Sequence, residues 1–199
     1  MLMIPPEMMA ALKKRYAEPQ RHYHTWRHIE ALLEHFEGLQ HKLNDPEAVL
    51  AALYWHDAIY DPKAADNEEK SALLLLDETK GLLKESRLAF AATIIRATHT
   101  HNVPDGLTDA EQSDLECFLD IDLSILATPQ PIFDAYEANI RKEFSFVPDQ
   151  IYRQGRKAVL LGFLNRRRLY FSTWFYDKWE QAARANLKRS IAQLDEMET

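Results

Sequence analysis

Apolar residues recur three and four positions apart along most of this chain, which is the spacing of one face of an α-helix. The segment that begins near Thr25 shows this spacing at Ile29, Leu32 and Phe36. No segment shows the sustained alternation of apolar and polar residues that a half-buried strand requires. Glycine is scarce, with 5 residues in 199, and good helix formers are plentiful. The chain is therefore predicted to be an all-α helical bundle.

Capping and helix-breaking residues divide the chain into eight or nine predicted helices. Asn44-Asp45-Pro46 is typical of a cap followed by proline in the first turn, and Thr108-Asp109-Ala110-Glu111 has the pattern of a capping box. The predicted helices cover approximately residues 6–16, 25–36, 46–60, 66–76, 84–99, 108–123, 129–144, 148–167 and 173–197.

Length and composition predict one domain that spans residues 1–199, because a chain of this size can bury a sizeable core and shows no linker or repeat. The single Cys117 cannot form an internal disulfide, which fits a reducing compartment. The first residues lack the basic start and apolar run of a signal peptide. No stretch approaches the roughly 20 apolar residues of a membrane span. We therefore expect a cytoplasmic protein that has no membrane partner.

The net charge of −7 argues against binding to extended nucleic acid, because affinity for the phosphate backbone comes from clustered Lys and Arg. It does not exclude a small phosphate ester held in a locally basic pocket. The oligomeric state is open, and a homo-oligomer is compatible with the sequence.

Three separate stretches carry the residue types of a metal site. Tyr23-His24-Thr25-Trp26-Arg27-His28 holds two histidines four residues apart, which on a helix share one face. His56-Asp57 ends an apolar helical stretch, where the two side chains would point about 100° apart. Asp120-Ile121-Asp122 lies in a third apolar segment. Ionisable groups in apolar helices are costly unless they are paired, so the three stretches together predict a ligand set for one divalent metal.

Histidine and carboxylate ligands without a thiolate suit a catalytic ion that keeps open positions for water. Manganese, iron, cobalt, nickel, magnesium and zinc are all chemically acceptable. Such an ion can turn a bound water into a nucleophile near neutral pH. The sequence therefore points to metal-dependent hydrolysis.

The chain resembles the HD-domain superfamily of metal-dependent phosphohydrolases, whose ligand pattern is His, then His-Asp, then a distant Asp. It is most similar to a bacterial branch of small predicted HD phosphohydrolases, over about residues 21–194. The motifs that carry this likeness are Arg21-His22-Tyr23-His24, Trp55-His56-Asp57-Ala58-Ile59-Tyr60-Asp61, Asp66-Asn67-Glu68-Glu69-Lys70-Ser71-Ala72, Asp120-Ile121-Asp122-Leu123-Ser124-Ile125-Leu126 and Glu180-Gln181-Ala182-Ala183-Arg184-Ala185-Asn186-Leu187.

The resemblance implies a role for each matched residue. The implied metal ligands are His28, His56, Asp57 and Asp122. Asp122 is preferred to Asp120 because it stands in the Asp-Leu-Ser match to cyclic-nucleotide phosphodiesterases, which belong to the same superfamily. The chain lacks the purine-clamping glutamine of those enzymes, so cyclic nucleotides are not implied.

The resemblance also implies that His24 is a general acid for the leaving oxygen and that Glu68 takes part in catalysis. Asp57 or Glu68 would then accept the proton of the attacking water.

Phosphate ester hydrolysis also needs positive groups around the phosphate oxygens, and arginine suits them through its forked donors. Arg21 and Arg184 are the candidates, and Asn67 is a further predicted substrate contact. His101, and with less support His99, is an additional candidate near the metal; the alternative is a histidine that interacts with the helix dipole. Asp61 either orients the attacking water or only closes its loop.

Three functions fit these features. The favoured one is hydrolysis of a small phosphorylated molecule, such as a nucleotide, by a phosphomonoesterase or phosphodiesterase. A non-catalytic metal- or nucleotide-binding module would keep the ligands and lose the proton donors, which His24 and Glu68 argue against. An iron oxygenase of the HD fold would need further histidine ligands, for which only His99 and His101 are at hand.

Overall fold

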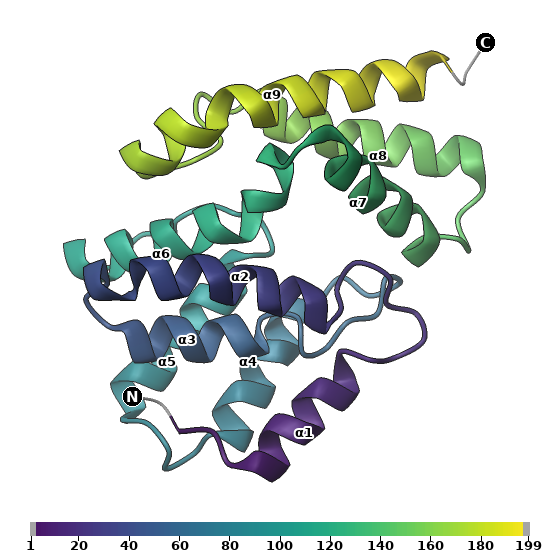
Figure 1. Ribbon diagram of the computed structural model, residues 1–199. Helices are drawn as coiled ribbons and strands as arrows, with labels where there is room; N and C mark the ends of the chain where they lie inside the picture. Colours follow the sequence, from purple (N-terminus) through teal and green to yellow (C-terminus); the bar gives the residue numbers. More distant parts are fainter. Residues whose placement is uncertain (1–2, 197–199) are drawn as a thin grey trace. The chain divides into compact units, whose positions relative to one another are not determined.

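The chain folds into α-helices joined by turns and short loops (Figure 1). The computed structural model describes residues 3–196, and in that range it has nine α-helices, two 3₁₀-helices and no strand. The predicted all-α class and the predicted eight or nine helices are confirmed. The elements are α1 (Pro6–Arg15), α2 (Trp26–Leu39), η1 (Gln40–Lys42), α3 (Pro46–Trp55), α4 (Asn67–Glu78), α5 (Glu85–Ala97), α6 (Asp109–Asp122), η2 (Leu123–Ala127), α7 (Gln130–Glu143), α8 (Asp149–Leu164) and α9 (Thr173–Glu196).

The helices form two compact units, residues 1–121 and residues 122–199. The first unit contains α1 to α5 and all of α6 except its last residue, Asp122. The second contains η2 and α7 to α9. The single domain expected from chain length stays a prediction.

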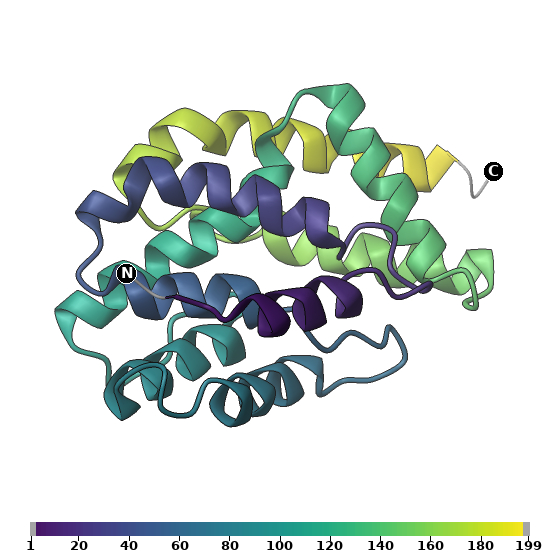
Figure 2. The same ribbon diagram turned by 60° about the horizontal axis from the view of Figure 1, so that its bottom comes forward.

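Helix α3 is the central helix of the first unit. It packs against α2, α4 and α5, and α4 and α5 also lie side by side (Figure 2). A helix that is apolar on most sides belongs in a core, and α3 fits this rule because Glu47 is its only charged residue. Its buried residues are Ala48, Val49, Ala51, Ala52, Leu53 and Trp55. The end of α3 therefore brings the next residue, His56, into the interior of the unit.

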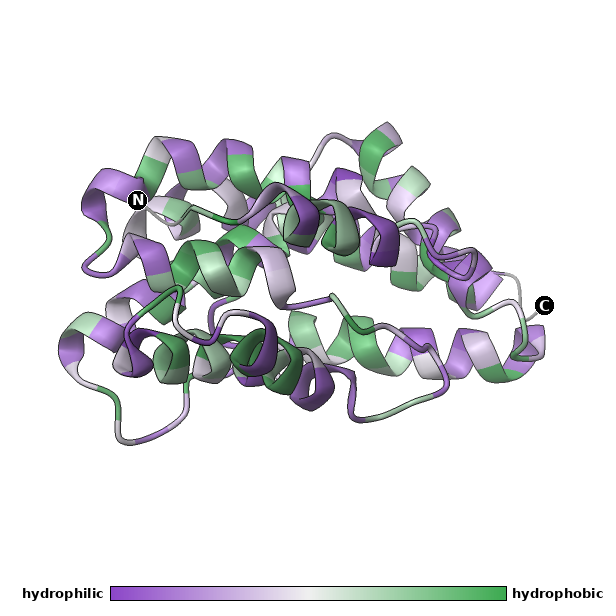
Figure 3. Ribbon diagram, turned by 90° about the horizontal axis from the view of Figure 1, so that it is seen from below, coloured by the Kyte–Doolittle hydropathy of each residue, from purple (hydrophilic) through white to green (hydrophobic). Residues whose placement is uncertain are grey.

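Helix α2 is amphipathic, and one of its histidines lies on the buried face. Ile29, Leu32 and Phe36 are buried at the spacing of a single helical stripe, and His28 is buried with them. Figure 3 shows this kind of pattern as alternating green and purple bands along the helices. The packing of α2 thus directs His28 into the core.

The third helix ends earlier than its sequence predicts. It was expected to continue to about residue 60, but it ends at Trp55, and His56 is its C-cap. The N–H of Ala58 then bonds to the carbonyl of Trp55 at 2.9 Å, which closes a turn. The hydroxyl of Ser71, from α4, accepts the N–H of Ile59 at 3.0 Å. The helix stops because a side chain distant in sequence takes up backbone groups that a further turn would need.

The other helix boundaries differ less from those predicted. The eighth helix ends at Leu164 instead of about residue 167, and η2, which follows α6, has no counterpart among the predicted helices. The ninth helix is described up to Glu196, and the predicted end at Met197 lies outside the described residues.

Side chains of α9 anchor the connections of the second unit. The carboxylate of Glu180 accepts the N–H groups of Leu169 and Tyr170 at 3.0 and 3.3 Å. Asn186 donates its amide hydrogens to the carbonyls of Leu126 and Thr128, each at 2.9 Å. These bonds satisfy buried backbone groups outside the helices, as a buried loop requires.

Helix α9 is the longest helix, with 24 residues, and it carries many charged side chains. Within residues 3–196, no helix combines the length and the apolar character that crossing a bilayer requires.

We predict that Leu53→Ala lowers the free energy of unfolding by about 2–5 kcal/mol, because it leaves a cavity beside fully buried neighbours. The matched control is Leu73→Ala, since Leu73 is 52% exposed; its expected change is within about 0.5 kcal/mol. Urea unfolding followed by circular dichroism measures both, and equal effects would contradict the described core.

Candidate metal centre

The two histidines of the first motif occupy different kinds of backbone. Helix α2 begins at Trp26, so His28 lies on the helix and His24 lies in the turn before it. His24 is therefore not on the helix, and the prediction that a helix places His24 and His28 one turn apart is wrong. Their rings are nevertheless neighbours, with centroids 6.2 Å apart. The turn, and not the helix, brings His24 close to His28.

His56 is oriented by a backbone carbonyl. Its side chain is buried, and its Nδ1 lies 2.9 Å from the carbonyl oxygen of Leu53, one turn earlier. A carbonyl can only accept a hydrogen bond, so Nδ1 carries a proton, and Nε2 presents its lone pair when the ring is neutral. This arrangement is the one by which proteins commonly orient a histidine that binds a metal.

Three side-chain atoms of the first unit converge on one point. The Nε2 atoms of His28 and His56 lie 3.1 Å apart. One oxygen of Asp57, Oδ2, lies 3.0 Å from His56 Nε2 and 3.7 Å from His28 Nε2. Ligands held about 2.0–2.2 Å from one ion, at angles between about 90° and 120°, are about 2.8–3.8 Å from one another. All three measured separations fit the edges of a metal coordination sphere.

Two imidazole nitrogens that face each other at this distance need a proton or a cation between them. Both rings are buried, with His56 2% and His28 6% exposed. The carboxylate of Asp57 beside them adds a negative charge that a divalent ion would balance. The arrangement is therefore suited to hold a cation.

Asp122 is the C-terminal residue of α6, and the rest of that helix belongs to the first unit. Asp122 itself is the first residue of the second unit. Asp120 is fully buried on the same helix. The choice of Asp122 over Asp120 as the expected ligand stays a prediction.

The electrostatics of Asp57 are set by the histidines around it. Burial of its carboxyl opposes ionisation, but the charges of His56, His24 and His28 and a hydrogen bond with His56 outweigh that effect. The pKa of Asp57 is therefore held well below its usual value. Asp57 is an anion at neutral pH, as a metal ligand must be.

Aromatic rings surround His24, and the sequence did not single them out for this role. The ring of His24 stacks on Tyr60, with centroids 4.3 Å apart. Tyr23 packs edge-on against His24 and also lies 5.0 Å from the ring of His28. Tyr23 and Tyr60 belong to the two motifs quoted from the sequence, which is the signal that could have identified them.

Arg21 lies close to the ligand residues, but its donors are directed at protein atoms. Its side chain is fully buried and bonds to the carbonyl oxygens of His24, Asp57 and Ala58. This environment gives no support to the predicted phosphate contact.

Arg184 is also engaged by its own unit. It donates to the carbonyls of Leu164 and Arg166 at 2.7 Å each and pairs with Glu180. Its contacts thus hold the connection between α8 and α9. The substrate contact expected for Arg184 stays a prediction.

Glu68 and His99 form a pair. Their Oε2 and Nδ1 atoms lie 3.1 Å apart, and both residues line a cavity of about 250 Å³ together with Arg96. His101 follows with a left-handed backbone (φ 49°), which histidine tolerates better than most residues. The catalytic role of Glu68 and the metal role of His101 stay predictions.

Asp61 and Asn67 close the loop between α3 and α4. Asn67 accepts the N–H of Asp61 at 3.0 Å and donates to its carbonyl at 2.9 Å. The carboxylate of Asp61 accepts the N–H of Lys63 at 2.9 Å. These contacts match the loop-closing alternative for Asp61.

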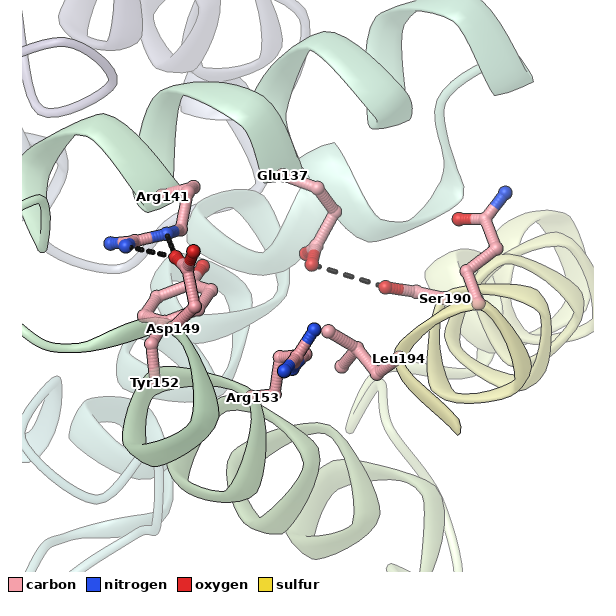
Figure 4. Close-up of a pocket in the computed structure, with 8 residues that line it drawn as sticks. Glu137, Arg141, Asp149, Tyr152, Arg153, Ser190 and Leu194 are labelled. Carbon is pink, nitrogen blue, oxygen red and sulfur yellow. Dashed lines mark hydrogen bonds and ion pairs between the residues drawn. The ribbon is translucent and has the colours of Figure 1, made fainter. Parts of the chain in front are cut away.

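A separate cavity lies in the second unit, between α7, α8 and α9 (Figure 4). It has a volume of about 340 Å³. Two of the residues that line it are carboxylates, and each pairs with another lining residue. Glu137 accepts a hydrogen bond from Ser190 at 3.1 Å, and Asp149 pairs with Arg141. Among the described residues that line it, none was expected to form part of the site.

Searches among protein-family models, curated proteins and solved structures found no match for this chain. The functional assignment therefore depends on the geometry of the metal centre and on the motifs of the sequence.

We predict that the protein, stripped of metal with a chelator, binds cobalt(II) with visible absorption bands, and that His56→Ala weakens binding more than about 100-fold. Even the loss of a group that only orients a ligand costs about 10- to 100-fold. His41→Ala, at an exposed position outside the site, is the control and should bind as the unaltered protein does. Unchanged binding by His56→Ala would remove His56 from the ligand set.

Proposed function

We propose that this protein is a metal-dependent phosphohydrolase that cleaves a phosphate ester of a small molecule. The observation that carries the proposal is the triangle of His28 Nε2, His56 Nε2 and Asp57 Oδ2, whose edges are 3.0–3.7 Å. The resemblance of the motifs to HD-domain phosphohydrolases supports the same reaction. The single cysteine fits a cytoplasmic enzyme.

The ligand atoms of the proposed site limit which ions it would hold. Two imidazole nitrogens and a carboxylate oxygen suit a divalent ion of manganese, iron, cobalt, nickel, magnesium or zinc, and we propose Asp122 as the fourth ligand. When bound, such an ion supplies Lewis-acid chemistry, which acidifies water and polarises a phosphoryl oxygen.

The protein's own residues supply orientation and proton transfer. The Leu53 carbonyl holds His56 in the tautomer that presents Nε2, and ionised Asp57 contributes the negative charge. Because the pKa of Asp57 is held low, its carboxylate is a weak base. Glu68, which pairs with His99, is the other candidate to accept the proton of the attacking water.

His24 is the candidate proton donor to the leaving oxygen. Its ring lies beside that of His28 and is half-buried, so a substrate at the site would be able to reach it. Stacking on Tyr60 holds the ring in place. An oriented imidazole is well suited to general acid catalysis.

We predict that the protein with added manganese, cobalt or nickel releases phosphate from members of a panel of phosphorylated metabolites, nucleotides included. His56→Ala and Asp57→Ala should each lower the rate at least about 1,000-fold, because metal activation supplies several kcal/mol. Circular dichroism of both variants should stay helical.

Two results would contradict this assignment. One is full activity in either variant. The other is a phosphate ester that raises the melting temperature of the protein without being hydrolysed, which would indicate a binding module.

We predict that His24→Ala lowers kcat about 100- to 10,000-fold on alkyl phosphates. On p-nitrophenyl phosphate the loss should be much smaller, because that leaving group departs without a proton. His22→Ala alters the adjacent exposed histidine and is the matched control. Equal losses of kcat on both kinds of substrate would rule out His24 as the acid.

A further inference from the structure

We infer that Arg21 is a positioning residue that ties together the two segments that carry His24 and Asp57. The inference rests on the proposed metal centre, but it assigns Arg21 a role different from substrate binding. It explains how two residues that no helix holds are kept in place.

The contacts of Arg21 join segments that are distant in sequence. Nη1 donates to the carbonyl of His24 at 3.0 Å and to that of Asp57 at 2.7 Å. Nη2 donates to the carbonyl of Ala58 at 3.1 Å, and Nε donates to the carboxylate of Glu18 at 3.2 Å. One guanidinium therefore fixes both the turn before α2 and the turn after α3.

Both of these turns need such support. His24 precedes α2, and Asp57 follows the last residue of α3, so helical hydrogen bonds hold neither. Asp57 has to keep its Oδ2 within 3.0 Å of His56 Nε2 to complete the triangle. A contact on the backbone of Asp57 itself limits how far its carboxylate can move.

Aromatic rings also pack against the guanidinium of Arg21. It lies 5.0 Å from the ring centroid of Tyr16 and 5.4 Å from that of Tyr60. Tyr60 also stacks on His24, so these contacts run from α1 to the site. Lysine could not replace this group, because an ammonium lacks the planar fork that bonds several carbonyls at fixed angles.

Burial separates positioning from phosphate binding. The side chain of Arg21 is 0% exposed, and its bonds are made to backbone oxygens and Glu18. A residue that binds phosphate would alter KM and leave metal affinity unchanged. A residue that positions Asp57 would alter metal affinity even when no phosphate is present.

The test compares Arg21→Lys with Arg184→Lys. Arg184 is a matched control because it also bonds backbone carbonyls, those of Leu164, Arg166 and Arg167, and a carboxylate on its own helix, that of Glu180. Calorimetric titration of each chelator-stripped protein with manganese(II), without substrate, measures metal affinity, and thermal unfolding measures stability.

We predict that Arg21→Lys weakens manganese affinity about 10- to 100-fold. Arg184→Lys should keep the affinity within about twofold, although both variants lower the melting temperature. Glu18→Ala keeps the guanidinium and removes one of its partners, and a smaller loss of several-fold is expected. This milder variant, at a half-exposed position, decides the question if Arg21→Lys does not fold.

Each outcome bears on a different statement. If manganese affinity is unchanged in Arg21→Lys, the positioning role is wrong, but the proposed metal centre is not contradicted. The same holds for unchanged affinity in Glu18→Ala if only that variant folds. Equal losses in the Arg21 and Arg184 variants assign the effect to general destabilisation and also overturn it. Absence of metal binding by the unaltered protein would end both proposals.

Discussion

The convergence of two imidazole nitrogens and one carboxylate oxygen inside a helical bundle is the interaction on which the functional interpretation depends. Such groups are costly to bury unless their lone pairs and charge are satisfied. Here His28 and His56 face each other at 3.1 Å with the carboxylate of Asp57 at their side. Two imidazole nitrogens that face each other need a proton or a cation between them. A divalent ion satisfies all three groups at once.

The packing of apolar helices brings these three atoms together. Helix α3 is mostly buried because it is mostly apolar, and its C-cap is His56. Helix α2 buries one stripe, and His28 is part of that stripe. Only the turns on either side of these helices need special support, and Arg21 supplies it from a fully buried position. The proposed metal ligands His28 and His56 and the packing residues thus belong to the same core.

Much of the helical pattern could be predicted because its signals are local. Proline and Asp45 mark the start of α3, where Asp45 caps the N–H of Ala48. Thr108 and Glu111 form the expected reciprocal bonds of a capping box. The end of α3 could not be predicted in this way, because Ser71 on another helix takes the backbone of Ile59.

The sequence by itself determined the residue types, their order and the helical stripes, because periodicity and caps act within a few neighbouring residues. The sequence therefore identified His28 and His56-Asp57 as candidate metal ligands. Only the tertiary structure decided that His24 lies in a turn and that the donors of Arg21 are directed at backbone carbonyls. The physical reason is that a side chain's partners depend on contacts between segments far apart in sequence. Local spacing carries no information about such contacts.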